Sequence, residues 1–148
     1  MQSGASLSSP AKVLTVNDKS VPEDVQELAS KLFDMARNGD TTNLAAYIDN
    51  GVDPNLTNQD GNSLLMLAAY AGHHETLDAL ISRGANVNQL NGRGQSPLAG
   101  AVFKQDMTVV EKLLNAGAFP HEGHPNAVDT ARMFGLDELA ATLSSHGA

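Results

Sequence analysis

The chain has no cysteine and no tryptophan, and aromatic residues make up only 4% of its 148 residues. The missing cysteines exclude disulfide bonds, thiolate metal ligands and cysteine nucleophiles. Apolar residues still account for 41% of the sequence, so the core is expected to be aliphatic. Small aliphatic side chains suit short helices that pack closely together.

Positive charge and long apolar stretches are also scarce. Nine Lys and Arg residues stand against 17 Asp and Glu, which gives a net charge of −8. An acidic chain repels phosphate backbones, so nucleic acid is not expected as a partner. No apolar run approaches the ~20 residues that cross a bilayer, and the N-terminus lacks the pattern of a secretory signal. We expect a protein of the cytoplasm, or of the nucleus in a eukaryote, with no membrane association.

The N-terminal segment differs in composition from the rest of the chain. It is rich in Ser, Gly and Pro and has few large apolar side chains, which predicts a disordered tail over residues 1–20. Ser8, Ser9 and Pro10 leave open a docking or modification segment. Residues 21–148 are expected to form one folded domain.

The folded part contains an internal repeat. Gly51, Gly84 and Gly117 recur at one constant interval, a period of roughly 33 residues, and many leucine and alanine positions recur at the same offset. A fixed period of this length is typical of solenoid proteins. The sequence predicts four tandem units at about residues 23–58, 59–91, 92–124 and 125–148, of which the last is three residues short.

One unit shows what is repeated. Within residues 59–91, "SLLMLAAYA" and "HETLDALISR" each have the apolar pattern of a short helix, and Gly72 separates them. The polar stretch "ANVNQLNGRG" then favours a tight turn. A single unit cannot bury its apolar face alone, so we expect neighbouring units to stack.

This pattern resembles the ankyrin repeat. In the third unit, "GQSPLAGAV" is similar to the family signature Thr-Pro-Leu-His-x-Ala-Ala. More narrowly, the chain resembles short stand-alone ankyrin proteins of microbes. The resemblance implies an all-α solenoid of about four helix-turn-helix repeats joined by β-hairpin-like loops. The sequence departs from the family where Met66, Ala99 and Asp129 replace the signature histidine, and where Gln105 replaces a glycine.

The resemblance also implies a function. We expect a monomeric, non-catalytic module that binds another protein through its concave face and hairpin tips. Matching the family positions one at a time gives the hairpin-tip residues Gln59, Asp60, Asn62, Arg93 and Gln95, the stripe Arg37, Tyr70, Phe103 and Met133, and the neighbouring Lys104. Aromatic and Arg side chains are frequent hot spots of binding. The alternative is that Tyr70 and Phe103 pack on adjacent loops and merely close the groove.

Catalytic motifs are weak by comparison, and no cofactor is expected. His73, His74 and Glu75 are adjacent in sequence, so on a helix they point in different directions and would not converge on one ion. "HEGH" at residues 121–124 is one residue shorter than the zinc-protease motif and lies in a loop. Two alternatives remain: a metal-binding or hydrolytic protein that uses His121 and His124, or a substrate of asparagine hydroxylation at hairpin residue Asn88.

Overall fold

The computed structural model describes residues 23–146 of the chain, and the expected N-terminal tail lies outside them. The described residues form eight helices and no strands. The helices follow one another as α2 (Glu23–Asn38), α3 (Thr41–Asp49), α4 (Leu64–Ala71), α5 (His74–Ser82), α6 (Pro97–Lys104), α7 (Met107–Asn115), α8 (Ala127–Met133) and α9 (Asp137–Ser145). None of these helices is both long enough and apolar enough to span a bilayer.

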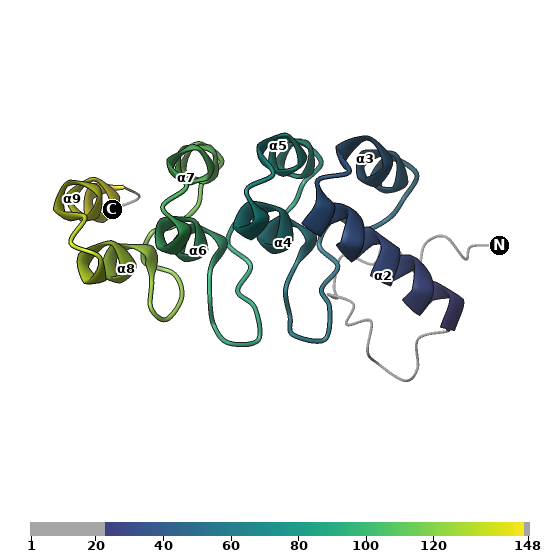
Figure 1. Cartoon of the computed structure of the whole chain (residues 1–148), viewed down its shortest axis with the longest axis horizontal. Helices are drawn as coiled ribbons and strands as arrows, with labels where there is room; N and C mark the ends of the chain where they lie inside the picture. The colour runs from purple at the N-terminus through teal and green to yellow at the C-terminus, as the bar shows by residue number, and fades with distance from the viewer. Residues whose placement is uncertain (1–22, 147–148) are drawn as a thin grey trace.

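The helices are arranged as two rows (Figure 1). The inner row consists of α2, α4, α6 and α8, and the outer row of α3, α5, α7 and α9. Within the inner row, α4 contacts both α2 and α6, and α6 contacts α8. Long loops project from the inner row on the side away from the outer row (Figure 1). The result is an all-α solenoid, as the repeat predicts.

The inner helices begin at equivalent hydrogen bonds. The Ser63 hydroxyl accepts a hydrogen bond from the N–H of Met66 at 3.0 Å, and Ser96 accepts one from Ala99 at 3.0 Å. In the shorter last unit, Asn126 takes this role for α8. A side-chain oxygen at this position satisfies one of the N–H groups left open at a helix start. The repeated polar residue therefore sets where each inner helix begins.

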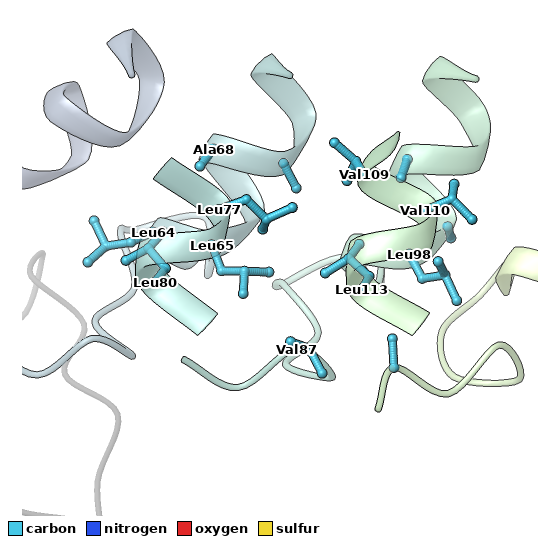
Figure 2. Packing of buried hydrophobic residues seen from close by; sticks show 14 of the residues in the cluster. Leu64, Leu65, Ala68, Leu77, Leu80, Val87, Leu98, Val109, Val110 and Leu113 are labelled. Carbon is cyan, nitrogen blue, oxygen red and sulfur yellow. The ribbon is translucent and has the colours of Figure 1, made fainter. Parts of the chain in front are cut away.

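The core is a continuous aliphatic layer that runs through all four helix pairs. Leu65 and Leu98 at equivalent positions of the inner row are buried, as are Leu77 and Leu113 of the outer row (Figure 2). Phe33 is the one aromatic side chain that the described residues bury. Because each pair covers the apolar face of the next, stability depends on contacts between neighbours.

Hairpin asparagines also tie each unit to the next. Asn55 accepts a hydrogen bond from the N–H of Asn86 at 2.7 Å, and Asn88 accepts one from the N–H of Phe119 at 2.8 Å. The Asn88 amide nitrogen also donates to the carbonyl of Gly117 at 3.2 Å. Asn55 and Asn88 stand one repeat period apart, so the same bridge forms at two successive boundaries.

Ion pairs also join neighbouring units along the outer row, although at positions that are not equivalent in the repeat. Arg83 lies 2.9 Å from Asp49, and Lys112 lies 2.8 Å from Asp78. Each pair joins an outer helix, or the residue that follows it, to the preceding outer helix. The Arg83 hydrogen bond is the main reason why the pKa of Asp49 lies below its usual value. Such exposed pairs contribute little stability individually.

Gln105 shows how the structure accommodates a departure from the family pattern. It ends α6 with φ 58° and ψ 35°, which is the left-handed conformation that Gly72 adopts at the end of α4. Among the described residues, Gln105 is the one non-glycine residue with a positive φ. The turn therefore keeps its geometry although the residue that favours it has been replaced.

Candidate functional site

Two adjoining hollows lie on the side of the inner row where the hairpin loops project. We call the first the polar hollow. It has a volume of about 320 Å³ and is lined by Asp60, Asn62, Met66, Leu67, Tyr70, Asn91, Arg93 and Gln95. The second, the apolar hollow, measures about 310 Å³ and is lined by Met66, Tyr70, Gln95, Ser96, Ala99, Gly100, Phe103, Pro125, Thr130 and Met133. Because the hollows share Met66, Tyr70 and Gln95, they form one continuous surface.

The Asn91 side chain orders the hairpin loop at the polar hollow. The Asn91 side-chain oxygen accepts hydrogen bonds from the N–H groups of Arg93 at 2.9 Å and Gln95 at 3.0 Å. Its amide nitrogen donates to the side-chain oxygens of Asn62 at 2.9 Å and Gln95 at 2.8 Å. Asn91 therefore holds the loop that carries Arg93 against the preceding hairpin.

The backbones of the two hairpins also approach each other closely. The N–H of Gly92 donates to the carbonyl of Asp60 at 2.9 Å. A side chain at Gly61 would place its Cβ only 2.6 Å from the Gly92 nitrogen. Glycine is thus required here for contact between the loops, and that contact fixes the edge of the polar hollow.

Aromatic side chains dominate the apolar hollow and remain half exposed. Tyr70 is 46% exposed and Phe103 is 53% exposed, while Met133 is 68% exposed. The Lys104 ammonium lies 4.7 Å from the centre of the Tyr70 ring, in cation–π geometry. The Phe103 ring lies 5.5 Å from that of Phe134. Both rings therefore have contacts within the protein and still keep about half of their surface exposed.

The structure brings most of the sequence-predicted residues together. Those that line a hollow are Asp60, Asn62, Tyr70, Arg93, Gln95, Phe103 and Met133, and Lys104 covers Tyr70. Two lie outside. Arg37 pairs with Asp34 on its own helix at 3.0 Å, and Gln59 is an exposed residue of the first hairpin that lines neither hollow.

Several residues that line or support this surface were not predicted from the sequence, and three of them have clear roles. Asn91 orders the hairpin, Phe134 supports Phe103, and Gly100 lies in the wall of the apolar hollow. A usable signal existed for Gly100, because a glycine inside a helical pattern is unfavourable and often has a packing or functional reason. No comparable signal marked Phe134, which follows the last residue of α8.

The histidine cluster has separate structural roles. The His73 ring nitrogen Nε2 lies 2.7 Å from the carbonyl of Arg37 in the preceding unit. His74 instead contacts the carboxylate of Asp106 in the following unit at 3.1 Å. Glu75 is exposed at the start of α5. The two histidines therefore contact different neighbouring units, and His73 stands just before the first residue of α5.

The environment of Asp106 changes the pKa of its carboxyl group. Burial alone would raise the pKa of Asp106. Hydrogen bonds from His74 and from the backbone N–H groups of Val109 and Thr108 outweigh burial, so the pKa lies below its usual value. Asp106 also precedes α7 and accepts the hydrogen bond from Val109 at 3.3 Å. It therefore serves both as a helix cap and as a tie between units.

The remaining candidate residues lie in exposed loops or bridges. His121 and His124 are exposed, and residues 23–146 bring no group of three or more His, Cys, Asp or Glu side chains together in a way that could hold a metal ion. Asn88 forms the bridge to the next hairpin described above. His121 and His124 are therefore exposed loop residues, and Asn88 has a structural role.

A family model for ankyrin repeats, in three copies, matches residues 32–124. The chain therefore belongs to the ankyrin repeat family, which confirms the resemblance and the all-α repeat fold. Repeats of this family generally mediate protein–protein interactions and are generally not catalytic.

Similar proteins carry the repeat in different contexts. An ankyrin repeat protein of Pseudomonas aeruginosa is 46% identical over 54 residues, which are 36% of this chain and 32% of that protein. Serine/threonine-protein kinase 12 of Arabidopsis thaliana is 30% identical over 118 residues, or 78% of this chain and 26% of the kinase. The ARF GTPase-activating protein Git of Drosophila melanogaster is 34% identical over 92 residues, which are 62% of this chain and 13% of that protein. The chain spans about a third or less of the length of these relatives.

Proposed function

We propose that this chain is a non-catalytic, monomeric binding module of the cytoplasm that holds a partner protein on the polar and apolar hollows. One observation carries the proposal. Tyr70 and Phe103 occupy equivalent positions one repeat period apart, and both keep about half of their surface exposed around one hollow. The chain has only two Tyr and four Phe residues, so two of them exposed around one hollow favour this surface as a binding site.

The energetics favour binding at this place. A partner that covers Tyr70 and Phe103 removes apolar surface from water, which is the main favourable term of most protein associations. Their rings are already held by Lys104 and Phe134, so they lose little conformational freedom on binding. Polar groups of the neighbouring hollow can then orient the partner. Truncating either ring should weaken binding by roughly 1–3 kcal/mol.

The experiment is a quantitative affinity capture from the native organism. The full chain is compared with the double variant Tyr70→Ala/Phe103→Ala and with the control Phe119→Ala. Phe119 is 51% exposed, almost the same as Phe103, but it lines neither hollow. We expect the wild type and the control to capture the same partner and the double variant to lose it.

The folded state of each variant is checked by circular dichroism before capture. If the double variant retains every partner of the wild type, the hollows are not the binding surface. Loss of the partner in Phe119→Ala would also contradict the proposal, because it would place binding at the hairpin that follows α7.

A further inference from the structure

We propose that the apolar hollow receives one large apolar side chain from an extended segment of the partner, and that a carboxylate next to that side chain binds Lys104. This inference deepens the proposed function and rests on it. It names a partner chemistry: an acidic peptide segment with an apolar anchor residue. Three observations support it, concerning the wall of the hollow, its lack of charge and the cations beside it.

The first observation is Gly100 in the wall of the hollow. It lies inside α6, where glycine is unfavourable compared with alanine. The fold does not demand it, because its φ lies outside the left-handed region and an added Cβ would meet the Tyr70 Cδ1 atom at 3.5 Å, an ordinary contact. What the missing side chain does provide is open space beside Tyr70. We infer that this space is used by a ligand.

The second observation is that, among residues 23–146, no charged side chain lines the apolar hollow. Its exposed walls include the rings of Tyr70 and Phe103 and the side chain of Met133. Methionine adapts its shape to different apolar groups, and aromatic faces offer a rigid surface. A charged side chain would lose its hydration here without gaining an oppositely charged partner in the lining, so an apolar side chain fits best.

The third observation is the state of the cations. Elsewhere in the described chain, most cationic side chains form ion pairs with aspartates; these are Arg37, Arg83, Lys112 and Arg132. In the same part of the chain, Lys104 and Arg93 have no carboxylate partner. Lys104 instead lies over the Tyr70 ring at the apolar hollow, and Arg93 lines the polar hollow.

Unpaired cations beside a binding surface are notable in a chain whose net charge is −8. They favour a carboxylate on the partner, because opposite charges across an interface stabilise the complex and speed association. Asp60 is the one carboxylate that lines the polar hollow. It disfavours a second carboxylate there, so we place the partner's acidic residue beside Lys104 and the apolar anchor.

The test begins with a random peptide library displayed on phage and selected against the full chain. We expect the enriched peptides to share one Leu, Met or Phe with an Asp or Glu nearby in sequence. A synthetic peptide of the enriched sequence then gives dissociation constants by fluorescence anisotropy. Gly100→Ala should raise the dissociation constant by about tenfold or more while raising the melting temperature, because alanine favours the helix but takes up the space beside Tyr70.

Lys104→Gln provides the independent arm, since it changes an exposed side chain and leaves the wall of the hollow intact. We expect the dissociation constant of the synthetic peptide to rise and its dependence on salt to weaken. The matched control is Lys31→Gln, another exposed lysine without a carboxylate partner, on α2 and away from both hollows. The control should bind the peptide as the wild type does.

The outcomes separate this inference from the proposed function. Enrichment of basic or purely polar peptides, no enrichment at all, or peptide binding unchanged by both Gly100→Ala and Lys104→Gln overturns the acidic, apolar-anchored segment. If Gly100→Ala does not fold, Lys104→Gln alone decides. Where the inference fails but Tyr70→Ala/Phe103→Ala still loses the captured partner, the binding surface stands and its ligand is of another kind. A double variant that binds both the peptide and the partner as the wild type does removes both proposals.

Discussion

Asn88→Ala tests whether the hairpin bridges hold neighbouring units together. The change removes two hydrogen bonds, from the Phe119 N–H at 2.8 Å and to the Gly117 carbonyl at 3.2 Å. A hydrogen bond contributes about 1 kcal/mol net to stability. Both bonds lie at the surface, where water can replace the lost partner, so the free energy of unfolding should fall by about 1–2 kcal/mol and not by more.

Two measurements check this expectation. Urea unfolding followed by circular dichroism gives the change in the free energy of unfolding. Hydrogen exchange followed by NMR gives the location, because the Phe119 amide should lose its protection in Asn88→Ala. In the sister variant Asn55→Ala, the affected amide should be that of Asn86, its partner at 2.7 Å. The matched control is Asn115→Ala, an exposed residue at the end of α7.

The reasoning is refuted if Asn88→Ala unfolds at the same urea concentration as the wild type and Asn115→Ala. It is also refuted if the Phe119 amide exchanges no faster in the variant. If the free energy of unfolding falls by much more than the expected range, the bridge orders the whole hairpin and does more than form two local hydrogen bonds.

Three further outcomes follow from single residues. The pKa of Asp106 is lowered in the folded state, so the stability that the ionised carboxylate contributes is present above the unfolded pKa and is lost as the pH falls through the lower folded pKa. In urea titrations, Asp106→Asn should therefore be less stable than the wild type at pH 7. The difference between the two should shrink under strongly acidic conditions. Gln105→Gly should raise the free energy of unfolding by up to about 1 kcal/mol, because glycine relieves the left-handed strain but loses more entropy on folding. Gly61→Ala should lower it by more than about 2 kcal/mol through its clash with Gly92, and an unchanged melting temperature would show that the hairpins can separate freely.

The fold could be predicted from the sequence because the period is carried by many residues at once. Repeated glycines, leucines and alanines specify where each helix ends and which face it buries, and a solenoid needs little more information than the unit and its period. Equivalent residues such as Leu65 and Leu98 are therefore both buried. The repeated serine at the start of the inner helices adds the cap that fixes their first turn.

The candidate surface was less predictable, because equivalent positions do not have equivalent neighbours. Arg37 and Tyr70 occupy the same position in successive units. Arg37, however, finds Asp34 one turn earlier on α2, whereas Tyr70 finds Lys104 from the next unit. Phe134 contacts Phe103 across a unit boundary, and the last unit is shorter than the others. Contacts of this kind depend on packing between units, which a periodic pattern does not encode.

The repeated bridges give the unit at residues 59–91 complementary ends. Toward the preceding unit it presents Arg83 to Asp49 and the Asn86 backbone to Asn55. Toward the following unit it presents Asp78 to Lys112 and the Asn88 side chain to the Phe119 backbone. Asn86 and Phe119 stand one repeat period apart, so a tandem duplication of this segment would reproduce the asparagine bridge at the junction it creates. The ion pair would be lost there, because Ser82 stands at the position equivalent to Asp49.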